Sequence, residues 1–295
     1  MQLISSKDNE LIKGIKKLKE KKYREQEGKY IIEGIKLIEE AINENANIDT
    51  IVICEECMKT YDIEDKLLYS IAKYNCIYVT SKVFNTITDV VNPQGIIGVI
   101  KKENEESEIN YKDDIIIALD NIQDPGNLGT ILRTVDSANL KQILVSKESA
   151  DAFNPKVVRS TMGAIFRVKI VECEDLKETL EKLKQKNYKV VVTSLNTKNS
   201  IYDIDYNKKV IVIGNEANGV SKEIQSIADE KIKIPMIGKT ESLNASVATG
   251  VIVYEYVRRC VSENGVNWNL FVLVIHSYIW NICVSMDIFN WQKFE

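Results

Sequence analysis

The sequence has 295 residues, of which 44% are apolar and 28% are charged. This length allows two domains, and the composition is typical of a soluble globular protein. The formal net charge of −4 weakly disfavours a nucleic-acid partner. The first residues are polar and charged, without the apolar segment of a signal peptide, so we expect a cytoplasmic protein.

The first hundred residues predict a small α/β unit. Residues 7–24 are typical of a charged helix, and residues 31–42 of an amphipathic helix with isoleucines on one face. Short runs rich in β-formers follow at 50–54, 76–79 and 96–100. Residues 101–114 are mostly charged and nearly free of bulky apolar side chains, which is typical of a linker.

A basic stripe lies in the first of these predicted helices. The segment from Lys13 to Arg24 contains seven lysines and arginines and only one acidic residue, Glu20. Such a stripe is most often a solvated helix face, and the alternative is a phosphate-binding surface. Only six of the 39 basic residues are arginines, so each arginine is more informative than a lysine wherever a planar fork of donors is needed.

The six cysteines do not form a disulfide framework. Cys54 and Cys57 make one Cys-x-x-Cys pair, but no second pair or histidine follows at zinc-finger spacing. We expect structural, reduced thiols, with a metal or redox role as the alternative.

After the linker, strand-like and helix-like segments alternate in a β-α-β rhythm. The strand-like runs show almost no polar alternation, which is typical of strands buried on both faces. We therefore expect an α/β domain with a mainly parallel sheet covered by helices. The predicted strands are 115–119, 142–146, 167–171, 190–195, 210–214 and 231–235.

Three loops that follow predicted strands are rich in small polar residues. The first, 120–139, contains Asn127 and Arg133; the second, 212–221, contains Gly214 and Glu216; the third, 234–250, contains Ser242 and Asn244. Each alone is explained by a turn or a helix cap. Together they predict a ligand site, because open sheets bind ligands beyond the carboxyl ends of their strands. No G-x-G-x-x-G fingerprint is present, which makes a dinucleotide dehydrogenase a remote alternative.

In this order the loops resemble the three motifs of the SpoU/TrmH family in the SPOUT superfamily of RNA methyltransferases. The resemblance covers about residues 113–259 and rests on N-x-G-x-x-x-R (127–133), G-N-E-x-x-G (214–219) and I-P-M-x-G-x-x-x-S-L-N-x-S-x-A (234–248). The first hundred residues resemble the substrate-binding domain of the L30e type that many members carry. The expected domains are therefore 1–105 for RNA binding and 113–260 for methyl transfer.

The resemblance implies S-adenosylmethionine as methyl donor, an RNA ribose 2′-hydroxyl as acceptor, a trefoil knot in the second domain, and a homodimer through the knotted region. Methyl transfer of this kind needs no metal. The implied cofactor-binding residues are Thr193, Gly214, Asn215, Ile234, Met236 and Leu243. The implied catalytic residues are Arg133, Asn127, Glu216, Ser242 and Asn244.

For Arg133 we expect a cationic clamp that stabilises the developing alkoxide, because arginine is almost never neutral near pH 7. The alternative role is an ion pair with Asp136 on the face of a helix. Candidates for RNA contacts are Lys16, Lys17, Lys21, Lys22, Arg24, Lys156 and Arg159, although Arg159 fits an internal ion pair equally well.

The leading interpretation is 2′-O-methylation of 23S rRNA. The same reaction on tRNA is an alternative, which the L30e-like domain disfavours. A non-catalytic RNA-binding protein that keeps the fold is another. The intact motif residues argue against it.

The tail, residues 261–295, has no counterpart in the family. It holds all three tryptophans and the only histidine, and its apolar run 270–286 is at the lower limit for a membrane span. No Lys or Arg flanks this run, so we expect no membrane span. A packed extra element and a shifted or extended reading frame both stay open.

Overall fold

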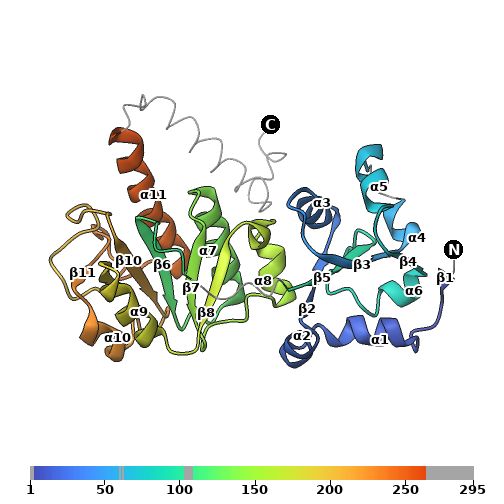
Figure 1. The fold of residues 1–295 in the computed structure, drawn as a ribbon, viewed down its shortest axis with the longest axis horizontal. Coiled ribbons are helices and arrows are strands. Elements are labelled where there is room, and N and C mark those ends of the chain that lie inside the picture. Colours follow the sequence, from blue (N-terminus) through green and yellow to red (C-terminus); the bar gives the residue numbers. More distant parts are fainter. Residues whose placement is uncertain (1–2, 60, 62, 103–108, 264–295) are drawn as a thin grey trace.

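The structure is a computed structural model that describes residues 3–59, 61, 63–102 and 109–263. Figure 1 shows two α/β units side by side, one built from the first hundred residues and the other from the rest of the described chain. Each unit has its own central sheet, so the predicted fold class is confirmed.

The N-terminal unit has a mixed five-stranded sheet in the order β1-β4-β3-β5-β2. Its strands are β1 (Leu3–Ile4), β2 (Lys29–Glu33), β3 (Ile48–Ile53), β4 (Cys76–Val79) and β5 (Ile96–Lys101). Its helices are α1 (Glu10–Lys17), α2 (Lys21–Glu27), α3 (Ile35–Asn43), α4 (Glu55–Met58), α5 (Asp65–Ile71) and α6 (Ser81–Phe84). β5 runs antiparallel to both β2 and β3.

Two predicted helices of this unit are wrong in extent. The charged helix 7–24 is two helices, because the chain turns between Lys17 and Lys21. The segment 31–42 begins as strand β2, where Tyr30–Ile32 are buried against β5, and it becomes helix α3 only after Gly34. Gly34 has a φ of 109°, a conformation that side-chain-bearing residues rarely adopt, so it separates the strand from the helix.

The C-terminal unit has a six-stranded sheet in the order β11-β9-β10-β6-β7-β8, and every pairing is parallel. Its strands are β6 (Ile115–Asp120), β7 (Gln142–Ser146), β8 (Lys169–Cys173), β9 (Lys189–Thr193), β10 (Lys209–Gly214) and β11 (Glu230–Ile232). Its helices are α7 (Pro125–Ser137), α8 (Pro155–Ser160), the 3-10 helix η1 (Ala164–Phe166), α9 (Leu176–Gln185), α10 (Lys222–Ile227) and α11 (Ala245–Glu263).

Helices cover both faces of this sheet, as the apolar strands predicted. One core contains α7, α8 and α11, and the other contains α9 and α10. Because all six strands are parallel, the carboxyl ends of β6, β9, β10 and β11 lie at one edge of the sheet, and the three motif loops follow β6, β10 and β11. The trefoil knot stays a prediction.

The two units share a continuous junction. Val158 and Ile165 of the second unit belong to the same apolar cluster as β2 and α3 of the first. Phe153 stacks on Tyr30 with ring centroids 4.9 Å apart. The junction is thus a packed interface as well as a chain connection.

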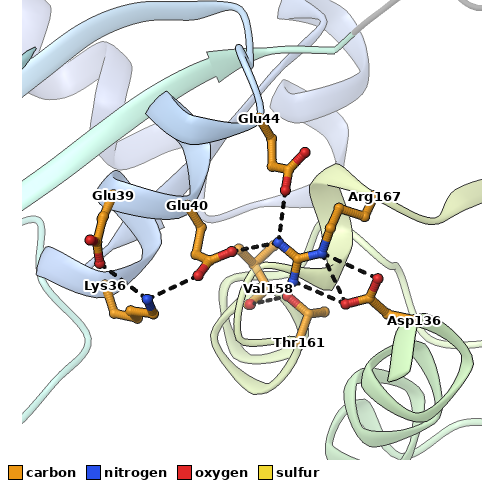
Figure 2. A network of polar contacts seen from close by, with 8 residues as sticks. All are labelled: Lys36, Glu39, Glu40, Glu44, Asp136, Val158, Thr161 and Arg167. Carbon is orange, nitrogen blue, oxygen red and sulfur yellow. Dashed lines mark hydrogen bonds and ion pairs between the residues drawn. The ribbon is translucent and has the colours of Figure 1, made fainter. Parts of the chain in front are cut away.

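Arg167 fixes the α3 side of this junction (Figure 2). Its guanidinium donates to Glu40 on α3 at 2.5 Å and to Glu44, the residue that follows α3, at 3.3 Å. The same group donates to Asp136, near the end of α7, at 3.0 Å. One arginine therefore joins the N-terminal unit to the helix that carries the first motif.

Within the described residues, no helix is long and apolar enough to span a membrane. The apolar run 270–286 and most of the tail, 264–295, lie outside the described residues.

Candidate active site

The first motif is held at the carboxyl end of β6 by the start of α7. Asp124 caps the helix, since its side chain accepts the Asn127 amide N–H at 2.8 Å, and Pro125 follows at the first helical position. Leu128, Ile131 and their neighbours bury the inner face of α7 against the sheet. Asn127 is consequently only 9% exposed, at the point where the sheet ends.

A cavity of about 420 Å³ opens beside this point. It lies between the ends of β9 and β10 and the third motif loop. The six residues predicted to bind the cofactor all line it: Thr193, Gly214, Asn215, Ile234, Met236 and Leu243. Their contact with the cofactor itself stays a prediction.

Gly214 is required by the backbone of its own loop. A Cβ placed on it would lie 2.1 Å from the backbone nitrogen of Val220 and 2.2 Å from the backbone carbon of Gly219. The glycine thus permits the loop 214–219 to close on itself, and a side chain there would first disrupt the protein. Asn215 also serves this loop, because its Oδ1 accepts the amide N–H groups of Ala217 and Asn218.

Four of the five predicted catalytic residues come together. Asn127 Nδ2 donates to Glu216 Oε1 at 2.5 Å, and Asn244 Nδ2 donates to Asn127 Oδ1 at 2.9 Å. Ser242 lines the same cavity as Glu216. The three motifs therefore meet through one chain of hydrogen bonds, although they are spread over more than a hundred residues.

Asn244 serves as a helix cap and as part of the site. Its Oδ1 accepts the backbone N–H of Ser246 at 2.9 Å at the start of α11, while its amide faces Asn127. The sequence allowed either a helix cap or a ligand site in the third loop, and Asn244 belongs to both.

Arg133 does not join this group. It is six residues after Asn127 on α7, which corresponds to a rotation of roughly 240° about the helix axis, and it is absent from the cavity lining. It is half-exposed and makes no ion pair or hydrogen bond through its guanidinium within the described part of the chain. The alternative pairing with Asp136 is wrong, because Asp136 binds Arg167.

The other five arginines all pair with carboxylates: Arg24 with Asp151, Arg159 with Glu33, Arg167 with Glu40, Glu44 and Asp136, and Arg258 and Arg259 with Glu255. Arg133 is thus the arginine whose guanidinium binds no carboxylate among the described residues.

The chemistry of the cavity fits S-adenosylmethionine. Its volume lies within the range of roughly 300–1,000 Å³ that is usual for cofactor sites. Glu216 and Glu241 are the acidic residues of the lining and Lys233 is the basic one, which suits a sulfonium cation. Ile234 and Leu243 supply apolar surface for an adenine ring.

The lining also includes a fourth loop, which the sequence reasoning missed. Ser194, Leu195 and Asn196 follow β9 directly and border the cavity. The signal was present, since Thr193-Ser194 are again short polar residues at the end of an apolar strand. Glu241 was likewise not singled out.

The predicted RNA contacts divide by exposure. Lys16, Lys17, Lys21, Lys22 and Lys156 are exposed. Arg24 is 2% exposed and bound to Asp151, so the structure does not offer it to a phosphate. Arg159 lies 3.9 Å from Glu33, which is the internal ion pair that the sequence left as an alternative.

Comparisons with known proteins agree with this geometry. Residues 114–254 match the SpoU rRNA Methylase family, and residues 9–98 match the MRM3-like substrate binding domain. The chain is 31% identical over 255 residues to the 23S rRNA (guanosine(2553)-2′-O)-methyltransferase RlmP of Bacillus subtilis, covering 86% of this chain and 98% of that protein.

Solved structures are similar over the same length. An AdoMet-bound rRNA methyltransferase from Sinorhizobium meliloti is 30% identical, with a TM-score of 0.77 over 88% of this chain and 98% of that one. An RNA 2′-O ribose methyltransferase is 25% identical, with a TM-score of 0.75 over 88% of this chain and all of that one. The chain therefore belongs to the SpoU rRNA Methylase family of RNA methyltransferases, as its three loops predicted.

Proposed function

We propose that the protein transfers a methyl group from S-adenosylmethionine to the ribose 2′-hydroxyl of a nucleotide in 23S rRNA. The observation that carries the proposal is the hydrogen-bonded chain Glu216–Asn127–Asn244 beside a cavity of cofactor size. The similarity to RlmP over nearly the whole of that protein supports the reaction and the acceptor.

Bound S-adenosylmethionine would supply an electrophilic methyl group on a sulfonium sulfur. The backbone of the loop 214–219 and the side chains of Ile234 and Leu243 would hold its adenosine part, and Glu216 and Glu241 would balance its positive charge. The work of the protein is then mainly positioning, which can supply several kcal/mol of the barrier.

As the methyl group transfers, the acceptor hydroxyl would pass its proton to water or to a non-bridging oxygen of the RNA phosphate, and negative charge would develop on the acceptor oxygen. Arg133 remains cationic and stabilises that charge together with an RNA phosphate. Its unpaired guanidinium supports this role, because no carboxylate of the described chain competes for it.

Arg133 completes the site of a second copy. It lies outside the cavity lining of its own chain. Apolar side chains around the cavity and on α11 are exposed, among them Leu195 at 61%, Ile237 at 103% and Val247 at 51%. Exposed apolar residues gathered near one site are typical of an interface, and a homodimer through this region would cover them.

RNA is held by residues 1–105, where Lys16, Lys17, Lys21 and Lys22 form an exposed basic surface on α1 and α2. Lys156 adds a cation on α8. Residues 113–260 carry out the transfer. A ribosomal RNA acceptor places the reaction in the cytoplasm.

The test is methyl transfer in vitro from labelled S-adenosylmethionine to 23S rRNA, 16S rRNA and tRNA separately. Digestion to nucleosides and mass spectrometry then identify the product. We expect one 2′-O-methylated nucleoside, from 23S rRNA. A methylated base, or transfer only to tRNA, would overturn the proposal. The variant Leu243→Arg, which fills the cavity, is the inactive control.

A further inference from the structure

Arg24 crosses the domain junction from inside the lysine-rich helix α2. Its side chain is 2% exposed, and Nε donates to Asp151 Oδ2 at 3.1 Å, with Nη2 contacting the same oxygen. Nη1 donates to the backbone oxygen of Leu18 at 2.8 Å. The fork thus ties α2 both to the end of α1 and to the catalytic domain.

A pair of this kind is not explained by stability alone. Asp151 is only 11% exposed, so both charges are largely removed from water. The attraction within a buried pair barely repays that desolvation, and apolar residues of similar size often serve stability as well. The hydrogen bonds from Arg24 to Asp151 are directional, so they fix the orientation of α2 relative to Asp151, which apolar contacts would not do.

Asp151 belongs to the segment 147–154, which holds the loop after β6. Ala150 donates its backbone N–H to Ile122 O at 2.8 Å, and Ile122 donates its own to Ser149 Oγ at 3.0 Å. Two residues after Ile122, Asp124 caps α7 and accepts the N–H of Asn127. Hydrogen bonds, together with the covalent steps from Asp151 to Ala150 and from Ile122 to Asp124, therefore connect Arg24 to the catalytic group.

α2 also carries exposed cations. Lys21 and Lys22 lie outward on the same helix from which Arg24 points inward. Arg24 and Asp151 therefore contribute, beside the apolar junction and Arg167, to fixing the distance between these lysines and the loop that holds Asn127.

We propose that Arg24 is a positioning residue: through Asp151 it fixes the RNA-holding helix α2 relative to the catalytic loop, so that RNA bound by the lysines presents one ribose to the cavity. The inference rests on the proposed function. In this proposal the Arg24 guanidinium aligns the bound RNA, and the lysines of α1 and α2 supply the affinity for RNA.

Two variants test the alignment. Arg24→Lys keeps the charge and loses the fork. The double variant Arg24→Met/Asp151→Leu replaces the pair by apolar side chains and leaves no charge buried and unpaired. It also removes the hydrogen bonds from the Phe153 N–H to Asp151 Oδ1 and from Arg24 to Leu18 O, so thermal unfolding is measured first. Asp89→Asn is the matched control, since it weakens the Lys19–Asp89 ion pair inside the N-terminal unit and leaves every cation of the basic stripe in place.

The measurements are thermal unfolding, RNA affinity, the single-turnover methylation rate at saturating RNA, and the map of methylated nucleotides. For the double variant we expect a near-native unfolding temperature and RNA affinity within about threefold, with a rate lowered by roughly 10- to 100-fold, the scale of a misplacement of about 1 Å. Methylation should spread to neighbouring nucleotides. The methylation rate of Arg24→Lys should lie between those of the wild type and the double variant, and the rate of Asp89→Asn should match the wild type.

A rate within twofold of wild type in the folded double variant would overturn the inference, as would a rate loss that disappears once RNA affinity is corrected for. If the double variant does not fold, a wild-type rate in Arg24→Lys overturns it. Failure of the proposed function can be told apart from failure of this inference, because in the first case the wild-type protein itself would transfer no methyl group to RNA.

One readout is independent of methyl transfer. The amide hydrogens of Ile122 and Ala150 should exchange more slowly when RNA binds the wild-type protein, and this change should vanish in the double variant. An equal change in both proteins would contradict a route through segment 147–154.

Discussion

Asn127 donates its side-chain amide to Glu216 across 89 residues of sequence, at 2.5 Å. The same side chain accepts a hydrogen bond from Asn244, so it donates to one motif and accepts from another. A side-chain amide can do both while neutral, because it carries a separate donor group and acceptor group. Asn127 is therefore the centre of the site, although it is absent from the cavity lining.

Replacing Asn127 by Asp should break the site while keeping its shape. A carboxylate would face Glu216 without a proton to donate, and an unsatisfied buried partner costs about 1–3 kcal/mol. We expect a lower unfolding temperature and weaker S-adenosylmethionine binding, measured by calorimetry. The double variant Asn127→Asp/Glu216→Gln returns a donor to the pair and should recover part of both. Wild-type stability in the single variant would show that the hydrogen bond contributes nothing.

Arg133→Ala should lower turnover by about 100-fold or more, the scale of losing one preorganised donor. Cofactor affinity should stay the same, because the proposed contacts of Arg133 are to the acceptor oxygen and an RNA phosphate rather than to the cofactor. Arg133→Lys should recover part of the rate if charge is what matters and little if the planar fork is required. Turnover at the wild-type level in Arg133→Ala, with normal RNA binding, would remove Arg133 from the mechanism.

The parallel sheet and the place of the site could be predicted because both depend on local pattern. Apolar strands without alternation indicate burial on both faces, and loops after such strands meet at one edge. The separation of β2 from α3 could not be predicted in this way. The isoleucines of 31–42 fit a helix, and the strand forms through pairing with β5, some 65 residues later.

The role of Arg24 was equally invisible in the sequence. It stands among lysines that are exposed, and its partner Asp151 is 127 residues away. Local charge patterning shows that a cation is present and leaves the direction of its side chain unspecified. The same limit applies to Arg133: only the structure shows that it has no ion-pair partner among the described residues, whereas the other five arginines are paired.

Two glycines of the site should respond differently to alanine. Gly214→Ala should lower the unfolding temperature together with cofactor binding, since its Cβ would meet backbone atoms 2.1 and 2.2 Å away. Gly238→Ala should be tolerated in the fold, because nothing lies within 4 Å of its Cβ among the described residues and its φ is ordinary. Thermal unfolding of both variants checks this. Equal stability of the two would contradict the backbone contact as the reason for Gly214.

Exchange of Lys16, Lys17, Lys21 and Lys22 for glutamine should reduce the salt dependence of RNA binding. Each phosphate contact that is lost removes about 0.7–0.9 from the slope of log K against log salt concentration. The variant should therefore bind RNA more weakly at low salt and lose less affinity as salt is added. Affinity measured at several salt concentrations decides this, and an unchanged slope would remove α1 and α2 from the RNA surface.

The domain junction should weaken in acid through Glu40. Burial alone raises the pKa of this carboxyl, but hydrogen bonds from Arg167 and Lys36 outweigh it and hold the pKa below its ordinary value of 4.5. A carboxyl whose folded pKa is lowered stabilises the protein above its unfolded pKa and stops doing so as pH falls through the folded pKa. The contribution of Glu40 is therefore present at pH 7 and lost below about pH 4.5.

Glu40→Gln isolates this effect from other acidic groups. At pH 7 the variant should be less stable than wild type by about 1–3 kcal/mol, the scale of a hydrogen bond to a charged group. The difference should shrink as pH falls below about 4.5, because wild-type Glu40 then becomes neutral as well. Glu39→Gln is the matched control, since Glu39 is more exposed and binds Lys36 without touching Arg167. Thermal unfolding from pH 3 to pH 7 measures all three proteins, and a constant difference across that range would show that Glu40 does not hold the junction through its charge.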